Sequence, residues 1–428
     1  MKSSHYSFKP LNIGRIVIWS LFALALAIAP LLFKSSLALT MLSQIGYLII
    51  ICLSYNILLG QGGMLSFGHA VYTGLGSFIA IHAMNMAGQP IPLVLIPLVG
   101  GVAGLGFAVL LGFVTTKKSG TTFAMITLGI GELVASMALM FPEFFGGEGG
   151  ITTNRVYGKP FLGMTFGSQM EVYYLIAVYC FACTVAMFAF TGTPLGRILN
   201  AVRDNPERVE FIGYNTQRVR YFAFIIAGFF AGIGGGLATI NFEIITGADS
   251  LNVVRSGGYL LFTFLGGATF FFGPIIGAVL LVIASVLLSE LTKAWLLYLG
   301  LVFLFMVMYA PGGIASLIMM NLRLAKFGRL KPLIASYLGL AGTGLVAILG
   351  AAAMVEMIYH LQLNAALGPT MTFMGIQLNA TALNSWFGSA FVMVTGLGLF
   401  EVVRRHYVHQ WGEIQEAVEK DIKRAEAL

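Results

Sequence analysis

Long apolar stretches separated by short polar segments follow one another along almost the whole chain of 428 residues. A helix needs about 20 residues to cross the hydrocarbon core of a bilayer. Apolar stretches that approach or exceed this length lie near residues 14–33, 37–59, 70–87, 92–114, 121–141, 171–191, 220–242, 258–272, 274–290, 294–310, 333–358 and 386–403. The pattern predicts an all-α protein, a polytopic bundle of about 12 transmembrane segments.

The apolar run at 258–290 decides the topology, because glycine and proline interrupt it near its middle. Cytoplasmic segments of membrane proteins are enriched in Lys and Arg. If the N-terminus is inside, the cationic segment 321–331 also lies inside only when this run crosses twice or is re-entrant, with a turn near Phe270–Pro274. We therefore expect both termini to be cytoplasmic.

The two ends of the chain differ from its apolar middle. Lys2, Lys9 and Arg15 precede the apolar run 16–33, which is either a cleaved signal peptide or a retained first helix. Its length favours a retained helix. After Arg404 the tail is polar, and its pattern predicts an amphipathic cytoplasmic helix, solvated or resting on the membrane rather than bound to a specific partner.

Composition supports a membrane protein and argues against other classes. The chain is 58% hydrophobic and 10% charged, whereas soluble domains are about 45–50% apolar and about 25% charged. The net charge of +7 is explained by cytoplasmic loops, and no basic run interleaved with aromatic residues suggests nucleic-acid binding. The three cysteines fall in apolar segments and are interpreted as buried thiols.

No constellation typical of catalysis or of metal binding occurs in the sequence. It has no G-x-x-x-x-G-K-[ST] loop, no H-E-x-x-H and no G-x-S-x-G. The chain is therefore not expected to be an enzyme. If ATP drives its function, another chain must bind the nucleotide.

A polar, glycine-rich break at residues 60–69 separates two apolar segments. Irregular backbone at membrane depth is tolerated only where it is buried in protein or lines a watery cavity. The break is either part of a translocation path or a plain turn at the cytoplasmic face, and spacing alone leaves both open. The candidate path residues here are Asn56, Gln61, Gly63, Ser66, Gly68 and His69.

Glu132 lies in the middle of the apolar segment 121–141. A carboxylate at this depth costs about 2.5 kcal/mol or more on insertion scales unless it is paired or faces a cavity. Two interpretations are open: Glu132 belongs to the translocation path, or it makes a buried structural hydrogen bond to a neighbouring helix.

The loop at 191–220 carries start and stop signals for two short helices. The segment 197–203 is amphipathic, and Asp204 or Asn205 can cap a second helix that begins at Pro206, with Glu207 favouring its N-terminal dipole. A folded cytoplasmic loop with mixed charge predicts a docking surface rather than a solvated connector. Its candidate residues are Arg197, Arg203, Asp204, Asn205, Pro206, Glu207 and Gly213.

At this loop the sequence resembles a known family, the M-type permease subunits of branched-chain amino acid type ABC importers. The resemblance covers roughly residues 40–318 and rests on ordered blocks: YNILLGQGGMLSFGHAVYTGLGSF, FAMITLGIGELVASM, PLGRILNAVRDNPERVEFIGYNTQRVRYFAFIIAGFFAGIGGGLA, GGYLLFTFLGGATFFFGPIIGAVLL and YLGLVFLFMVMYAPGGIASLI.

The resemblance implies a permease that pairs with a second, homologous permease in a bacterial inner membrane. It also implies two cytoplasmic ATPase subunits, which bind ATP and Mg, and a periplasmic solute-binding protein. The segment 197–213 matches the family's coupling loop. The segment 61–69 matches the family's glycine-rich segment, which favours a role in the path, and Glu132 matches a Glu commonly seen in its block. The substrate class would be a branched-chain or other amino acid, or a related small polar or carboxylate compound.

Two further considerations set the limits of the resemblance. The chain continues past residue 320 with an extension, 321–403, that carries two more apolar segments, and with the tail 404–428; the usual M-type pattern lacks both. The alternative function is an ion-coupled secondary transporter, which would need its own coupling site of intramembrane acids. Glu132 is nearly alone in this respect, which favours the importer.

Overall fold

The computed structural model describes residues 13–427 except 88–89, 158–162, 164, 327, 329–330 and 365–367. The predicted basic start at Lys2 and Lys9, and Arg329 of the cationic segment, lie outside the described residues. The chain divides into two compact units, 1–283 with 311–315, and 284–310 with 316–428. The expected boundary at residue 320 rests on the family resemblance and stays a prediction.

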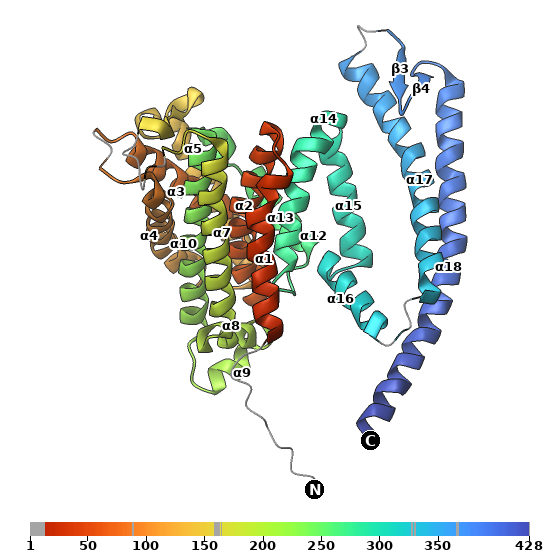
Figure 1. Cartoon of the computed structure of the whole chain (residues 1–428), viewed down its shortest axis with the longest axis horizontal. Coiled ribbons are helices and arrows are strands. Elements are labelled where there is room, and N and C mark those ends of the chain that lie inside the picture. Colours follow the sequence, from red (N-terminus) through yellow and green to blue (C-terminus); the bar gives the residue numbers. More distant parts are fainter. Residues whose placement is uncertain are drawn as a thin grey trace. The chain divides into compact units, whose positions relative to one another are not determined.

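The first unit is a helical bundle (Figure 1). Its elements are α1 (Ile13–Leu32), α2 (Ser36–Asn56), η1 (Ile57–Gln61), α3 (His69–Met84), η2 (Leu93–Leu95), α4 (Ile96–Thr115), α5 (Gly120–Met140), α6 (Pro142–Phe145), η3 (Gly147–Gly149), β1 (Ile151–Thr152), η4 (Arg155–Tyr157), α7 (Gln169–Gly192), α8 (Pro194–Asp204), α9 (Pro206–Phe211), α10 (Thr216–Phe242), β2 (Ile244–Ile245), α11 (Gly247–Ser250), α12 (Val253–Gly266) and α13 (Gly273–Val282).

Long helices of this bundle begin at capping side chains. Ser35 accepts a hydrogen bond from the backbone N–H of Ala38 at the start of α2, and Asn215 accepts one from Arg218 at the start of α10. Ser168 caps α7 in the same way. These side chains satisfy backbone N–H groups that have no partner within the helix, so the boundaries follow from local chemistry.

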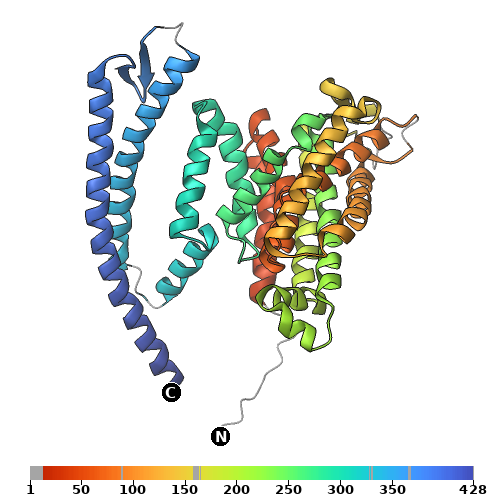
Figure 2. The same cartoon turned by 180° about the vertical axis from the view of Figure 1, so that it is seen from behind.

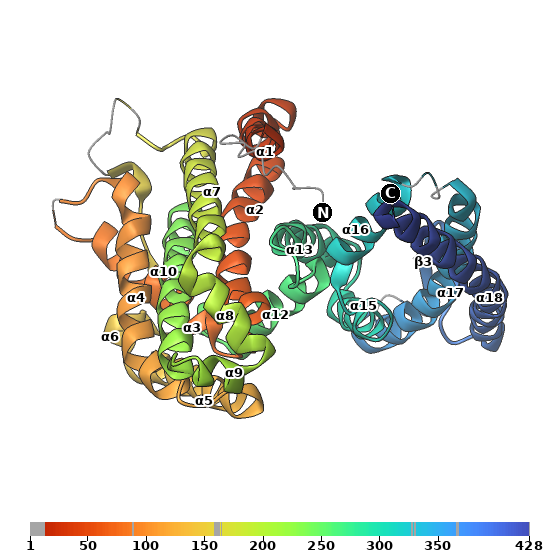
Figure 3. The same ribbon diagram turned by 90° about the horizontal axis from the view of Figure 1, so that it is seen from below.

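Helix α10 is the centre of the first unit, and it packs against α4, α3 and α2 (Figure 3). Glycines allow its backbone to come close to α4. A Cβ atom at Gly104 would lie 2.3 Å from the carbonyl oxygen of Gly228, and one at Gly232 would lie 2.2 Å from that of Gly100. Small residues recurring every four positions thus form the packing face of two helices, as is common in membrane bundles.

Two connecting segments meet at the end of α10. Strand β1 pairs antiparallel with β2, with Ile151 opposite Ile245. The Arg155 backbone N–H also donates to the Glu243 carboxylate over 2.8 Å. The loop between α5 and α7 is therefore fastened to the segment that follows α10.

The apolar run at 258–290 forms two helices rather than one. Helix α12 ends at Gly266, a turn occupies 267–272, and α13 begins at Gly273. A Cβ at Gly277 would lie 2.1 Å from the carbonyl oxygen of Phe262, so the two helices pack closely on each other. This hairpin has its turn close to the expected position and leaves both interpretations, two crossings or a re-entrant pair, open.

The second unit contains η5 (Ile283–Leu288, whose first residue belongs to the first unit), α14 (Ser289–Leu291), α15 (Trp295–Tyr309), α16 (Gly313–Lys326, whose first three residues belong to the first unit), α17 (Lys331–Leu363), β3 (Thr370–Phe373), β4 (Ile376–Asn379) and α18 (Leu383–Ala427). Helices α17 and α18 run side by side, and the antiparallel hairpin β3–β4 lies between them in sequence (Figures 1 and 2). Tyr298 and Thr292 both donate hydrogen bonds to the Glu356 carboxylate.

The predicted tail helix is the continuation of α18, which runs unbroken for 45 residues. Trp411 and Ile414 pack against a buried cluster that includes Leu324 and Leu333. The apolar side of the tail is therefore partly covered by the start of α17 and the end of α16.

Among the described residues, nine helices are long and apolar enough to cross a membrane, or ten if α15 and α16, which meet at 48°, form one span. The segments expected near 70–87, 258–272 and 294–310 are helices of only 16, 14 and 15 residues. A count of twelve membrane segments stays a prediction. The all-α description needs one correction, because two short two-stranded ladders accompany the helices.

The contact between α4 and α10 leads to a first prediction. Gly104→Leu should lower the thermal stability of the purified protein, because the new side chain must enter space held by the backbone of α10. Overpacking of this kind costs about 1–3 kcal/mol or more. Gly106→Leu on the same helix is the control, since nothing lies within 4 Å of its Cβ position. Equal melting temperatures for the two variants would contradict the packing.

Candidate functional site

The loop at 191–220 folds into the two short helices that its sequence predicts. Thr193 caps α8, with Pro194 at its first position. Asn205, rather than Asp204, caps α9 by accepting from the Arg208 backbone N–H over 3.0 Å, and Pro206 follows it. The break between the helices is therefore set by the Asn-Pro pair.

One side of this helical pair is anchored to the bundle and the other is exposed. Leu199, Val202 and Val209 are buried. The predicted docking residues Arg197, Arg203, Asp204, Glu207 and Gly213 are exposed. At the end of α9, Phe211 and Ile212 are 88% and 71% exposed, so a large apolar tip accompanies the charges.

Helix α8 lies directly against the glycine-rich break, a contact that the sequence did not predict. Asn200 donates from Nδ2 to the Gln61 side-chain oxygen over 2.9 Å. Arg203 donates from Nη1 to the Gly60 carbonyl and forms a 2.9 Å ion pair with Asp204. The two candidate regions predicted from the sequence are therefore in direct contact. This contact of Asn200 and Arg203 with Gln61 and Gly60 is called the joint below.

Gly63 is required at this joint for two reasons. Its φ of +63° is in the left-handed region that favours glycine. A Cβ there would lie 2.7 Å from Cγ of Arg203. The absence of a side chain therefore lets the Arg203 stem cross the break and reach Gly60.

The other residues of the break are packed inside the bundle. Asn56, Ser66 and His69 are each no more than 2% exposed. The His69 ring nitrogen Nε2 is 2.9 Å from the Ser54 hydroxyl, and Tyr55 donates to the Ser66 carbonyl over 2.8 Å. In this structure the break is neither a plain surface turn nor open to a cavity at these three side chains.

Further contacts hold the start of α3 in place. The Thr127 hydroxyl accepts from the Phe67 backbone N–H over 3.1 Å. A Cβ at Gly68 would lie 2.4 Å from the Thr127 carbonyl oxygen, so only glycine fits beside α5. The Ser256 hydroxyl accepts from the Ala70 backbone N–H over 2.9 Å and ties α3 to α12.

Glu132 lies on the exposed face of α5 and not in a buried hydrogen bond to another helix of the unit. Thr122, Met125, Gly129 and Ser136 are exposed positions at helical spacing on the same side. Besides Met125, this stripe carries an acid, two hydroxyls and a glycine, which is unusual for a surface that meets only lipid. This stripe fits contact with another protein or with water.

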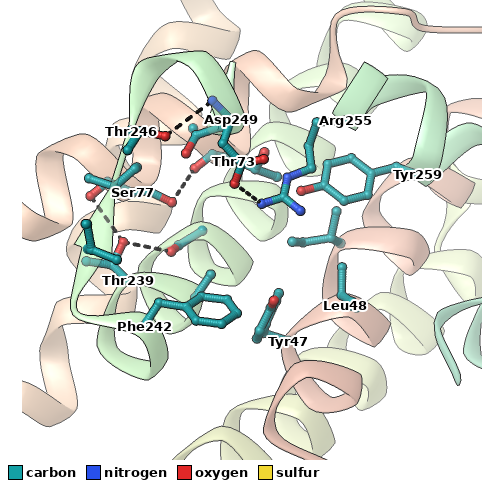
Figure 4. A pocket seen from close by; sticks show the side chains of 17 residues that line it. Tyr47, Leu48, Thr73, Ser77, Thr239, Phe242, Thr246, Asp249, Arg255 and Tyr259 are labelled. Atoms are coloured by element: carbon teal, nitrogen blue, oxygen red, sulfur yellow. Dashed lines mark hydrogen bonds and ion pairs between the residues drawn. The ribbon is translucent and has the colours of Figure 1, made fainter. Parts of the chain in front are cut away.

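A cavity of about 360 Å³ lies near the far end of α10 (Figure 4). Side chains from α2, α3, α10, α11 and α12 line it, among them Tyr47, Leu48, Ile51, Thr73, Ser77, Thr239, Phe242, Asp249, Arg255 and Tyr259. Arg255 and Asp249 form an ion pair of 2.9 Å at its edge. Sequence reasoning missed this site; the only signal was an acid and a base six residues apart between two apolar segments.

Comparison with known proteins agrees with the fold and with the sequence pattern. The model of the family described as branched-chain amino acid transport system / permease component matches residues 37–312. The high-affinity branched-chain amino acid transport system permease protein LivM of Salmonella typhimurium is 28% identical over 305 residues, which cover 66% of this chain and 71% of the relative.

Two other relatives show the breadth of the similarity. LivM of Escherichia coli is 27% identical over 298 residues, covering 64% of this chain and 69% of the relative. The guanosine ABC transporter permease protein NupQ of Bacillus subtilis is 32% identical over 78 residues, 18% of this chain and 24% of the relative. No solved structure matches the chain significantly.

The chain is a multi-pass helical membrane protein of the transport class, and ATP hydrolysis belongs to other subunits in such systems. It belongs to the family of branched-chain amino acid transport system permease components.

The joint between α8 and the break leads to a second prediction. Gly63→Ala should displace Arg203 and raise amide hydrogen exchange across α8 by about tenfold or more, because a hydrogen bond to a charged group contributes about 1.5–3 kcal/mol. Gly120→Ala is the matched control: its φ is +62° and nothing lies within 4 Å of its Cβ position. Equal exchange in the two variants would show that Arg203 does not hold α8.

Proposed function

We propose that this chain is one half of the membrane pore of an ABC importer for a small solute of the branched-chain amino acid type. A second, homologous permease would complete the pore, two cytoplasmic ATPases would drive it, and a periplasmic binding protein would deliver the solute. The setting would be a bacterial inner membrane with both termini of this chain in the cytoplasm. Family membership and the relatives named LivM support this proposal.

One observation carries the mechanism: the exposed α8–α9 pair is hydrogen-bonded to the break between α2 and α3. An ATPase that moves α8 would pull on Gly60 and Gln61 through Arg203 and Asn200. These two residues end η1, which continues α2 without interruption. Motion at the cytoplasmic face would therefore reach a helix that crosses the membrane.

The α8–α9 surface suits a protein partner. It carries both signs of charge, at Arg197, Arg203, Asp204 and Glu207, together with the exposed apolar side chains of Phe211 and Ile212. Interfaces are commonly built this way, with an apolar centre and a polar rim. An ion-coupled secondary transporter would not need such a surface.

The stripe on α5 is proposed to face the partner permease and the path between the two. Glu132 would then be covered or hydrated in the assembled pore, which removes the cost of exposing a carboxylate to lipid. In this proposal the path runs along the surface of the subunit near Glu132. Ser66 and His69 are buried in the bundle and would hold the break in place.

Charge reversal tests the docking surface. Asp204→Lys combined with Glu207→Lys should abolish co-purification of the ATPase subunits that accompany the wild-type chain from its native membranes, because both carboxylates are exposed on α8–α9. The control is Glu413→Lys combined with Glu416→Lys, which reverses two exposed acids on α18. ATPases recovered with the first variant at wild-type yield would refute the docking assignment.

Replacement of Glu132 tests the path. Glu132→Gln should reduce cellular uptake of radiolabelled leucine by about tenfold or more, if a charged hydrogen bond of about 1.5–3 kcal/mol is lost during passage or assembly. Glu143→Gln, at an exposed acid on α6, is the control. Unchanged uptake in Glu132→Gln would leave this carboxylate without a role in the path.

A further inference from the structure

We propose that the cavity at the far end of α10 is a solute site within the permease itself and that it binds a small α-amino acid zwitterion. The site rests on the proposed function for its biological role. Its chemistry, however, is given by the residues that line it. They are distinct from the break and from the docking surface described above.

The cavity has the size and the wall of a small-molecule site. Its volume of about 360 Å³ lies at the lower end of the range of about 300–1,000 Å³ that ligand pockets occupy. Leu48, Ile51, Phe242 and Ile245 supply an apolar wall. An aliphatic side chain of a few carbon atoms would find hydrocarbon contacts there.

Hydroxyl groups and the charged pair also line the cavity. Thr73, Ser77 and Thr239 come from α3 and α10, and Figure 4 shows Tyr259 beside the Arg255 guanidinium. Arg255 donates from Nη2 to Asp249. A guanidinium has five N–H donors and a carboxylate has about four acceptor sites, so each group can take a second partner.

A zwitterion satisfies both charges at once. Its carboxylate would accept from Arg255 and its ammonium group would donate to Asp249, so the cavity would remain neutral with the solute bound. The existing pair is partly exposed, with side-chain exposures of 41% and 68%, and exposed pairs contribute only about 0–1 kcal/mol. Rearranging it around a ligand therefore costs little. A neutral sugar or nucleoside gains nothing comparable from this pair.

The cavity lies at the end of the bundle opposite the α8–α9 pair. Helix α10 starts at Thr216, directly after the docking loop, whereas the cavity is lined by its final residues from Gly235 to Phe242. At 1.5 Å per residue, Gly235 is about 28 Å along the helix from Thr216, close to the full thickness of a hydrocarbon core. With α8–α9 in the cytoplasm, the site lies near the outer face, where a solute would arrive.

Glycine allows two of the helices that line the site to approach each other closely. A Cβ at Gly235 would lie 2.1 Å from the Thr73 carbonyl oxygen, so α10 and α3 touch through their backbones below the cavity. The Thr239 hydroxyl donates to the Ser77 carbonyl over 3.3 Å. These contacts hold α3 and α10 together at the cavity wall, and the charged pair lies on α11 and α12.

Direct binding tests the proposal. The full-length permease, purified in nanodiscs, is titrated calorimetrically with L-leucine, L-leucine methyl ester, 4-methylpentanoate and guanosine. L-leucine should bind saturably. The ester lacks the carboxylate and 4-methylpentanoate lacks the ammonium group. Each should therefore bind at least about tenfold more weakly than L-leucine, as expected for loss of one charged hydrogen-bonding partner.

Variants connect binding to the named pair. Arg255→Gln and Asp249→Asn should each weaken leucine binding by about tenfold or more. Arg404→Gln is the control, because Arg404 also forms an ion pair with a carboxylate, that of Glu401, and lines no part of the cavity. Absent leucine binding in the wild type, equal binding in Arg255→Gln and Arg404→Gln, or tighter binding of guanosine than of leucine would each overturn the proposal.

A second measurement does not depend on the charged variants folding. Ser250→Cys at the cavity wall should react with a membrane-impermeant thiol reagent added from outside, and L-leucine should slow the reaction. The native Cys52, Cys180 and Cys183 are buried. No slowing by leucine would overturn the site. If leucine does not slow the reaction but ATP-dependent uptake persists, the solute site is wrong and the proposed importer function stands. If the ATPases do not associate with the chain but leucine still binds, the importer function is wrong and the solute site stands.

Discussion

The close approach of the α10 backbone to α3 and α4 is the constraint on which the rest of the first unit depends. In lipid, helices gain no hydrophobic energy by meeting each other, so association relies on packing and on short backbone distances. Glycines at 76, 100, 104, 228, 232 and 235 provide those distances. Once α10 is held in this way, both of its ends are fixed in space. Its first residues follow the α8–α9 pair, and its last residues line the cavity.

This arrangement places the contact between α8 and the break at one end of α10 and the cavity at its other end. Helix α10 leads from the α8–α9 pair to Thr239 and Phe242. Helix α2 leads from the break at Gly60, which Arg203 contacts, to Tyr47 and Leu48 on the cavity wall. The same two helices therefore extend from the proposed docking region to the proposed solute site.

The helices α17 and α18 of the second unit lie beyond the part of the chain that the family model matches. The family match ends at residue 312, and α17 and α18 follow it. Their contact is close: a Cβ at Gly350 would lie 2.4 Å from the Met393 backbone nitrogen, and one at Gly396 would lie 2.4 Å from that of Ala347. The two helices thus pack through glycines, as the helices of the first unit do. Helix α18 is continuous, so the last apolar segment and the polar tail form a single helix.

The sequence by itself determined the membrane class, most helix positions and the division of the docking loop at Asn205-Pro206. These features depend on hydrophobic length and on capping, which act over a few residues. It did not determine the span count, because α12 begins after the Asn252 cap and ends before Gly267, whose φ is +115°, and so has only 14 residues. Only the tertiary structure decided that Gln61 meets Asn200, 139 residues away, that His69 is buried and Glu132 exposed, and that Asp249 and Arg255 share a cavity with Tyr47 and Thr73. The physical reason is that such contacts arise from which faces of distant helices pack together, and the spacing of residues along one helix does not contain that information.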